Sequence, residues 1–250
     1  MSSGPALRFY LAALVDAQIR YRHGARPDNP RPIRTEKPGA TSWIDSVASA
    51  SVTTGPTTAQ RMTARTKKER HLQGALRRLE TAGLVELPKM NSKIQYDGFT
   101  LLNEWGARDD ADPELLDYRV PIAAEPCVEL PATFISNGWI HVLEDSEIAV
   151  LLMVACGLHN LPNEPMVAIP GDDRLAHYGL SRTAYMANRM LAWLGLLQVV
   201  PVDRWMDGTR AEGYETPEDA RLHRMAVMEE GFNENPVETL TAQLKHQLSR

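Results

Sequence analysis

Apolar residues recur every three to four positions along much of the chain, which is the spacing of amphipathic helices. This pattern predicts helices over residues 6–21, 41–51, 58–82, 145–158, 172–178, 181–194, 216–230 and 236–248. Short apolar and β-branched runs predict strands over residues 84–87, 93–102, 166–169 and 196–202. In the first helix we expect Leu7, Tyr10, Leu11, Leu14 and Ile19 to form the buried face. The fold class that follows is mainly α with small β-hairpins.

Breaks in this pattern suggest an order of parts along the chain. We expect a basic domain over residues 1–102, an acidic linker over 103–126, a second domain over 127–215 and C-terminal helices over 216–250. Within the first domain, residues 23–40 contain four prolines and predict a loop or a mobile arm.

Two segments that lie 112 residues apart share a pattern. Each is a predicted helix that ends at a glycine, followed by leucine and a strand. Five identical pairs carry the similarity: Ala75 and Ala187, Arg77 and Arg189, Leu79 and Leu191, Gly83 and Gly195, Leu84 and Leu196. Because the elements around the two segments follow the same order, we expect a structural repeat.

This order of elements resembles the winged helix-turn-helix superfamily of DNA-binding domains. Residues 175–185 look like the helix–turn–helix junction of that family, and residues 191–197 and 79–85 look like the end of its recognition helix and its first wing strand. The first half departs from the family at Gly55 and Pro56, where the turn before the helix is long. The resemblance implies two tandem winged-helix domains, similar in layout to transcription regulators and plasmid replication initiators.

Charge is divided unevenly along the chain, although the net formal charge is only −5. Residues 1–100 contain 16 Lys and Arg against 8 Asp and Glu, whereas residues 101–250 contain 11 against 24. Between Arg61 and Arg78 there are seven basic residues and one acidic residue, Glu69. A positive first half favours a polyanionic partner, and a duplex is the partner that the resemblance implies.

Candidate DNA contacts follow from the outward faces of the two predicted recognition helices. Arginine can bond guanine and glutamine can bond adenine in the major groove, which suits Arg70, Gln73 and Arg77 in the first half and Arg182, Tyr185 and Arg189 in the second. Phosphate contacts are expected from Arg61, Arg65, Lys67, Lys68 and Arg78. Wing contacts are expected from Lys89, Lys93, Arg204 and Arg210. The alternative for any one of these side chains is an ordinary solvated surface charge, and basic residues of the arm between Arg20 and Lys37 either add phosphate contacts or belong to a plain loop.

Motifs of catalytic chemistry are absent from the sequence. There is no glycine-rich phosphate loop, no HExxH pair and no nucleophile elbow, and the two cysteines are too few for a disulfide framework. We therefore expect no enzyme activity, no metal and no cofactor. No apolar run is long enough to span a bilayer, so a cytoplasmic protein is the default expectation.

The function predicted from these features is sequence-specific binding of double-stranded DNA by a transcription regulator. One alternative is a plasmid-type replication initiator. Another is a protein–protein adaptor that pairs with itself or with a partner through the acidic second half.

Overall fold

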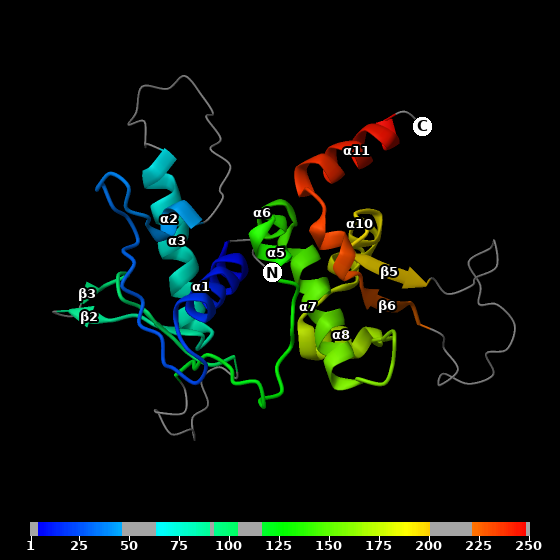
Figure 1. The fold of residues 1–250 in the computed structure, drawn as a ribbon, viewed down its shortest axis with the longest axis horizontal. Helices are drawn as coiled ribbons and strands as arrows, with labels where there is room; N and C mark the ends of the chain where they lie inside the picture. The colour runs from blue at the N-terminus through cyan, green and yellow to red at the C-terminus, as the bar shows by residue number, and fades with distance from the viewer. Residues whose placement is uncertain (1–4, 47–63, 91–92, 105–116, 201–221, 249–250) are drawn as a thin grey trace, which may run out of the picture. The chain divides into compact units, whose positions relative to one another are not determined.

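The computed structural model describes residues 5–46, 64–90, 93–104, 117–200 and 222–248, and the chain divides into two units, residues 1–126 and 127–250 (Figure 1). The fold is mixed, with many helices and small antiparallel pairs of strands. Among the described residues, no helix is both long and apolar enough to cross a membrane.

In the described part of the first unit, three helices and a strand hairpin surround the core. The elements are α1 (Ala6–Arg20), α2 (Trp43–Ser46), α3 (Ala64–Thr81), β1 (Val85–Glu86), β2 (Lys89–Met90), β3 (Lys93–Ile94) and β4 (Thr100–Leu101). Phe9, Trp43 and Phe99 pack against one another with ring centroids 5.4 to 5.7 Å apart. Leu72 and Leu76 of α3 complete this core. Residues 47–63, where parts of two predicted helices fall, lie outside the described residues.

The buried face of α1 differs from the predicted one. Phe9, Ala13 and Ala17 are buried at a spacing of four residues, while Ile19 is 79% exposed. The small alanine side chains allow α1 to pack closely on α3, because they keep little bulk between the two helix backbones. Tyr10 is buried as predicted. The prediction was wrong for Ile19, and it missed Phe9 and the two alanines, because it counted none of these three on the face that meets α3.

The two sides of the hairpin after α3 differ in length, and the second side, which contains β3 and β4, is longer than the first side, which contains β1 and β2. Val85 lies opposite Leu101, but Lys89 lies opposite Ile94, so the second side contains three more residues between these pairs. The predicted strand over 93–102 is therefore two short strands, β3 and β4. The extra residues bind the preceding arm, because the Asp97 carboxylate accepts a hydrogen bond of 2.6 Å from the Ile33 amide.

The proline-rich arm is a loop packed against the unit, so of the two predicted forms, a loop and a mobile arm, the structure has the loop. Ile33 is buried in the core, and the buried Asn29 side chain donates to the Phe99 carbonyl at 2.6 Å. Tyr118 and Val120 are also buried in this core. Residues 117–120 therefore belong to the first unit and not to a linker; residues 105–116 lie outside the described residues.

The second unit is built around one long buried helix. Its elements are α5 (Thr133–Ser136), α6 (Trp139–Val142), α7 (Asp145–Asn160), α8 (Gly171–Tyr178), α9 (Arg182–Tyr185), α10 (Ala187–Trp193), β5 (Leu197–Val200), β6 (Arg224–Val227), η2 (Glu229–Asn233) and α11 (Pro236–Leu248). In α7, a capping box between Glu144 and Glu147 starts the helix. Ile148, Leu151 and Val154 are buried on this helix.

Part of the predicted helix over 216–230 is a strand. Residues 224–227 form β6, which pairs with β5, and Met225 also pairs with Val167 on its other side. A run as short as Met225–Val227 does not distinguish helix from strand by periodicity, so the partners on both sides decide its conformation. Residues 216–221 lie outside the described residues, and the C-terminal segment is part of the second unit rather than a separate helical end.

The two segments 112 residues apart end their helices in the same way. Leu84 donates its amide to the Leu79 carbonyl and Leu196 donates to the Leu191 carbonyl, both at 2.9 Å. Gly83 and Gly195 have φ of 70° and 73°, in the left-handed region that this helix end requires. In both units a strand follows directly, so the repeated sequence produces a repeated local structure.

Candidate nucleic-acid interface

One side of α3 is basic and open. Leu72, Ala75, Leu76 and Leu79 are buried on one side of the helix. At 3.6 residues per turn, the opposite side contains Lys67, Arg70, Gly74, Arg77 and Arg78, and the four cations among them are exposed. We call these five residues the basic face. Among the described residues, Arg70 and Arg78 have no hydrogen bond or ion pair from their side chains to the protein, so both guanidinium groups can bind a partner.

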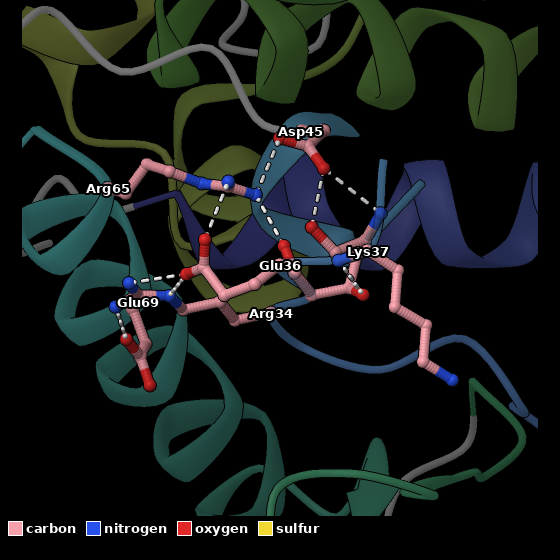
Figure 2. A network of polar contacts seen from close by, with 8 residues as sticks. Arg34, Glu36, Lys37, Asp45, Arg65 and Glu69 are labelled. Atoms are coloured by element: carbon pink, nitrogen blue, oxygen red, sulfur yellow. Dashed lines mark hydrogen bonds and ion pairs between the residues drawn. The ribbon is translucent and has the colours of Figure 1, made fainter. Parts of the chain in front are cut away.

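Two of the predicted phosphate contacts lie on a different side of α3. Arg65 and Lys68 are half-buried beside the arm, on the side of the helix that faces the core. Arg65 donates to the Thr35 carbonyl at 2.9 Å, and its guanidinium lies 3.6 Å from Glu36 and 3.8 Å from Asp45 (Figure 2). This arginine therefore holds the arm and α2, and it is not part of the basic face.

Arg34 of the arm completes the network that Figure 2 shows. Its guanidinium binds Glu36 at 2.6 Å and Glu69 of α3 at 3.1 Å. The hydrogen bond from Arg34 lowers the pKa of Glu36, and a hydrogen bond from Ser42 lowers the pKa of Asp45. Because Glu69 is paired with Arg34, it does not neutralise the cations of the basic face.

Arg77 is positioned by the hairpin. Its Nε donates to the Tyr96 hydroxyl at 2.6 Å, and Tyr96 stands in the residues between β3 and β4. This contact directs one cation of the basic face toward the hairpin, where Lys89 is exposed on β2. Lys93 lies in β3, next to Met90 in the register. Gln73, by contrast, reaches back to Glu69 at 3.5 Å.

The corresponding helix of the second unit is interrupted, which corrects the prediction of one helix over 181–194. The α-helical hydrogen-bonding pattern breaks at Met186, between α9 and α10. Tyr185 is half-buried, with the Arg174 guanidinium 3.6 Å from its ring centroid and its hydroxyl 3.7 Å from the Met225 sulfur. Arg182 and Arg189 are exposed, but Tyr185 packs on β6 instead of joining them on a common outward face.

The arginines of the arm are engaged within the first unit. Arg31 binds Asp16 at 2.7 Å and lies over the Trp43 ring, and Arg26 binds Asp117 at 2.8 Å. Together with Arg34, these contacts hold the arm in place, so the expected phosphate contacts from these three side chains are replaced by internal ion pairs. Arg61, Arg204 and Arg210 lie outside the described residues.

Sequence reasoning missed two residues of this surface. Gly74 lies in the middle of the basic face, and no atom of the described structure comes within 4 Å of the position that a Cβ would take there. Its signal was a glycine inside an otherwise strong helix, where glycine is unfavourable. Tyr96 had no signal, because only the extra residues of the hairpin bring it beside Arg77.

No metal-binding group appears among the residues that the structure describes, since they contain no cluster of three or more His, Cys, Asp or Glu side chains. A scan against models of protein families and searches of curated proteins and of solved structures find no match for this chain. The sequence and the geometry of the described residues are therefore what a proposal of function can use.

Proposed function

We propose that this protein binds specific sequences of double-stranded DNA as a transcription regulator, with a first unit of the winged-helix type and α3 as its recognition helix. The observation that carries the proposal is the basic face of α3. The exposed guanidinium groups of this face lack carboxylate partners within the described residues. The two acidic residues of α3, Glu69 and Glu80, lie to one side of the basic face. A hairpin with a further exposed lysine follows the helix directly, which is the order of a recognition helix and its wing.

The spacing of the basic face suits a major groove. Arg70 and Arg77 are separated by two helical turns, which is about 10.5 Å along the axis. This matches about three base pairs of a duplex, and an arginine can bond the O6 and N7 atoms of guanine at either position. Gly74 lies between them, so the helix backbone can approach the DNA closely there. Lys67, Arg78 and Lys89 are placed to bind phosphates beside the groove.

The test is selection of duplexes from a random pool by the full chain, followed by fluorescence anisotropy on the enriched sequence. The double variant Arg70→Ala, Arg78→Ala should lose at least about tenfold in affinity, because each charged contact contributes on the order of 1 kcal/mol or more. The matched control is Arg119→Ala, Arg224→Ala, which removes the same charge from two exposed positions outside α3 and should change affinity less than about threefold. Absence of enriched sequences, with no saturable binding below about 1 µM, would reject the proposal.

Replication initiation at a plasmid-type origin is the second candidate, and the repeated helix end favours it. Two units that both lead from a glycine-terminated helix into a strand can lie on one DNA as tandem modules. An initiator would select clustered repeats of one site, whereas a regulator would select single sites or a pair. The sequences and spacing recovered by crosslinking in cells distinguish the two.

A further inference from the structure

The last helix of the chain leaves an apolar stripe exposed. The start of α11 packs against α6 within the second unit, and there Pro236 is buried and Leu240 is half-buried. Figure 1 shows α11 after η2, at the end of the chain. On another side of α11, Val237 is 62% exposed, Leu244 47% and Leu248 89%. Isolated apolar residues on a surface are common, but three on one stripe of a 13-residue helix form a continuous patch.

The stripe has the spacing of a helix-pairing seam. Val237, Thr241, Leu244 and Leu248 follow one another at intervals of four, three and four residues. These are the alternating intervals of the a and d positions in a heptad repeat, which pack between two helices. Thr241 is the one polar member of the seam, and it is exposed like its neighbours.

The charges beside the apolar stripe indicate which partner helix can pack on it. Glu238 and Lys245 are both exposed, lie seven residues apart and flank the seam on the same side. If a second copy of α11 lies antiparallel, Val237 meets Leu248 of the partner subunit and Thr241 meets Leu244 of the partner subunit. The same register brings Glu238 beside Lys245 of the partner subunit, and the two-fold axis repeats this ion pair. In a parallel pair this flank faces the other flank of the partner helix, on which Leu240 lies, and Glu238 does not meet Lys245 of the partner subunit.

We propose that α11 is a self-association surface, which pairs with α11 of a second copy of this chain in an antiparallel arrangement. This pairing follows from the apolar spacing and the charge complementarity of the helix, so it goes beyond DNA binding and does not depend on it. Two helical segments of this length bury a small area, so the dimer dissociates in the micromolar range and forms most readily where two copies are held close together.

Sedimentation equilibrium of the full chain over about 5 to 500 µM tests the proposal, and a monomer–dimer equilibrium is the expected result. Leu244→Glu should raise the dissociation constant at least about tenfold, because it places two carboxylates in the seam. Glu238→Lys and Lys245→Glu should each raise it about threefold through like-charge contacts. The double reversal Glu238→Lys, Lys245→Glu should return it to within about twofold of the starting value, which only an antiparallel self-pair requires.

Three results would overturn the proposal. These are a monomer across the whole concentration range, a dimer that Leu244→Glu does not weaken, and a double reversal as weak as the single ones. Thermal unfolding by circular dichroism accompanies each variant. Both side chains of the charge reversals are exposed, but the Glu238 carboxylate also accepts a hydrogen bond of 3.4 Å from the Asn235 side-chain amide at the start of α11. If Leu244→Glu or Glu238→Lys disturbs folding, Lys245→Glu, which leaves that hydrogen bond in place, still decides the question.

Discussion

At the scale of single residues, Gly74 is the position where stability and binding are expected to change in opposite directions. A glycine inside a helix costs about 0.5 to 1 kcal/mol relative to alanine, and nothing in the described structure occupies the space of its missing side chain. Gly74→Ala should therefore raise the free energy of unfolding by about that amount. It should also weaken DNA binding about tenfold or more, because the added methyl group holds α3 away from the groove.

Urea unfolding and fluorescence anisotropy on the same preparation measure both effects for Gly74→Ala. A loss of affinity in a protein that has become more stable cannot come from unfolding. Unchanged affinity would remove Gly74 from the interface and would place the centre of the basic face away from the DNA.

Gly231 is a second glycine with a specific role, and this role is purely steric. A Cβ at this position would lie 2.2 Å from the Gly195 carbonyl oxygen, where η2 passes the end of α10. Gly231→Ala should lower the free energy of unfolding by about 2 to 3 kcal/mol, because two backbone segments must separate. The control is Gly171→Ala, which meets only the end of the Arg174 side chain and should change stability by less than about 0.5 kcal/mol. Equal stability of the two variants in denaturant unfolding would contradict this packing.

At the scale of elements, the sequence predicted helices well where the periodic signal was long, as in α7 and α11. It failed where the partner decides the structure. The strand β6 is set by β5 and Val167, and the path of the arm is set by single contacts such as Asn29 with the Phe99 carbonyl. These contacts join residues far apart in sequence and leave no periodic pattern.

The candidate site was predicted in part for the same reason. Helical spacing was enough to place Arg70 and Arg77 on one face, since that depends on α3 alone. Helical spacing could not show that Arg65 lies outside the basic face, because its partners Glu36 and Asp45 come from the arm and from α2. Only the tertiary structure brings these carboxylates beside Arg65.

The network between the arm and α3 should make the first unit sensitive to acid. The pKa values of Glu36 and Asp45 are lowered in the folded state by Arg34 and Ser42. Each carboxylate therefore stabilises the fold above its ordinary pKa of about 4, and this contribution is lost as the pH falls through the lowered folded value. Between about pH 5 and pH 3, the unfolding free energy of Glu36→Gln, Asp45→Asn should fall less steeply than that of the unchanged protein.

Urea unfolding at a series of pH values measures this difference, and Glu125→Gln is a matched exposed control outside the network of Figure 2. The two exposed carboxylates contribute modestly, so the comparison depends on the slope of the pH dependence rather than on the absolute stability. Parallel curves for the network variant and the unchanged protein would show that the ion pairs do not hold the arm.

At the scale of the whole molecule, the two units have a common local design and opposite charge. The helix ends at Gly83 and Gly195 are alike, but the first hundred residues are basic and the rest are acidic. The second unit also lacks a continuous helix at the position of α3, since α9 ends before Met186. We infer that the first unit provides most of the phosphate contacts and that the second unit serves mainly for pairing.

The salt dependence of DNA binding tests this division of roles. Each phosphate contact contributes about −0.9 to the slope of log affinity against log salt concentration, so the three proposed contacts from Lys67, Arg78 and Lys89 give a slope of about −3. Lys67→Ala, Arg78→Ala should reduce the magnitude of this slope by about 2, whereas Arg182→Ala, Arg189→Ala should leave it unchanged within about 0.5. Anisotropy titrations of the selected duplex between about 50 and 300 mM KCl provide the slopes. An equal reduction in both double variants would mean that the two units share the DNA, and the exposed Arg182 and Arg189 would then belong to the interface together with α3.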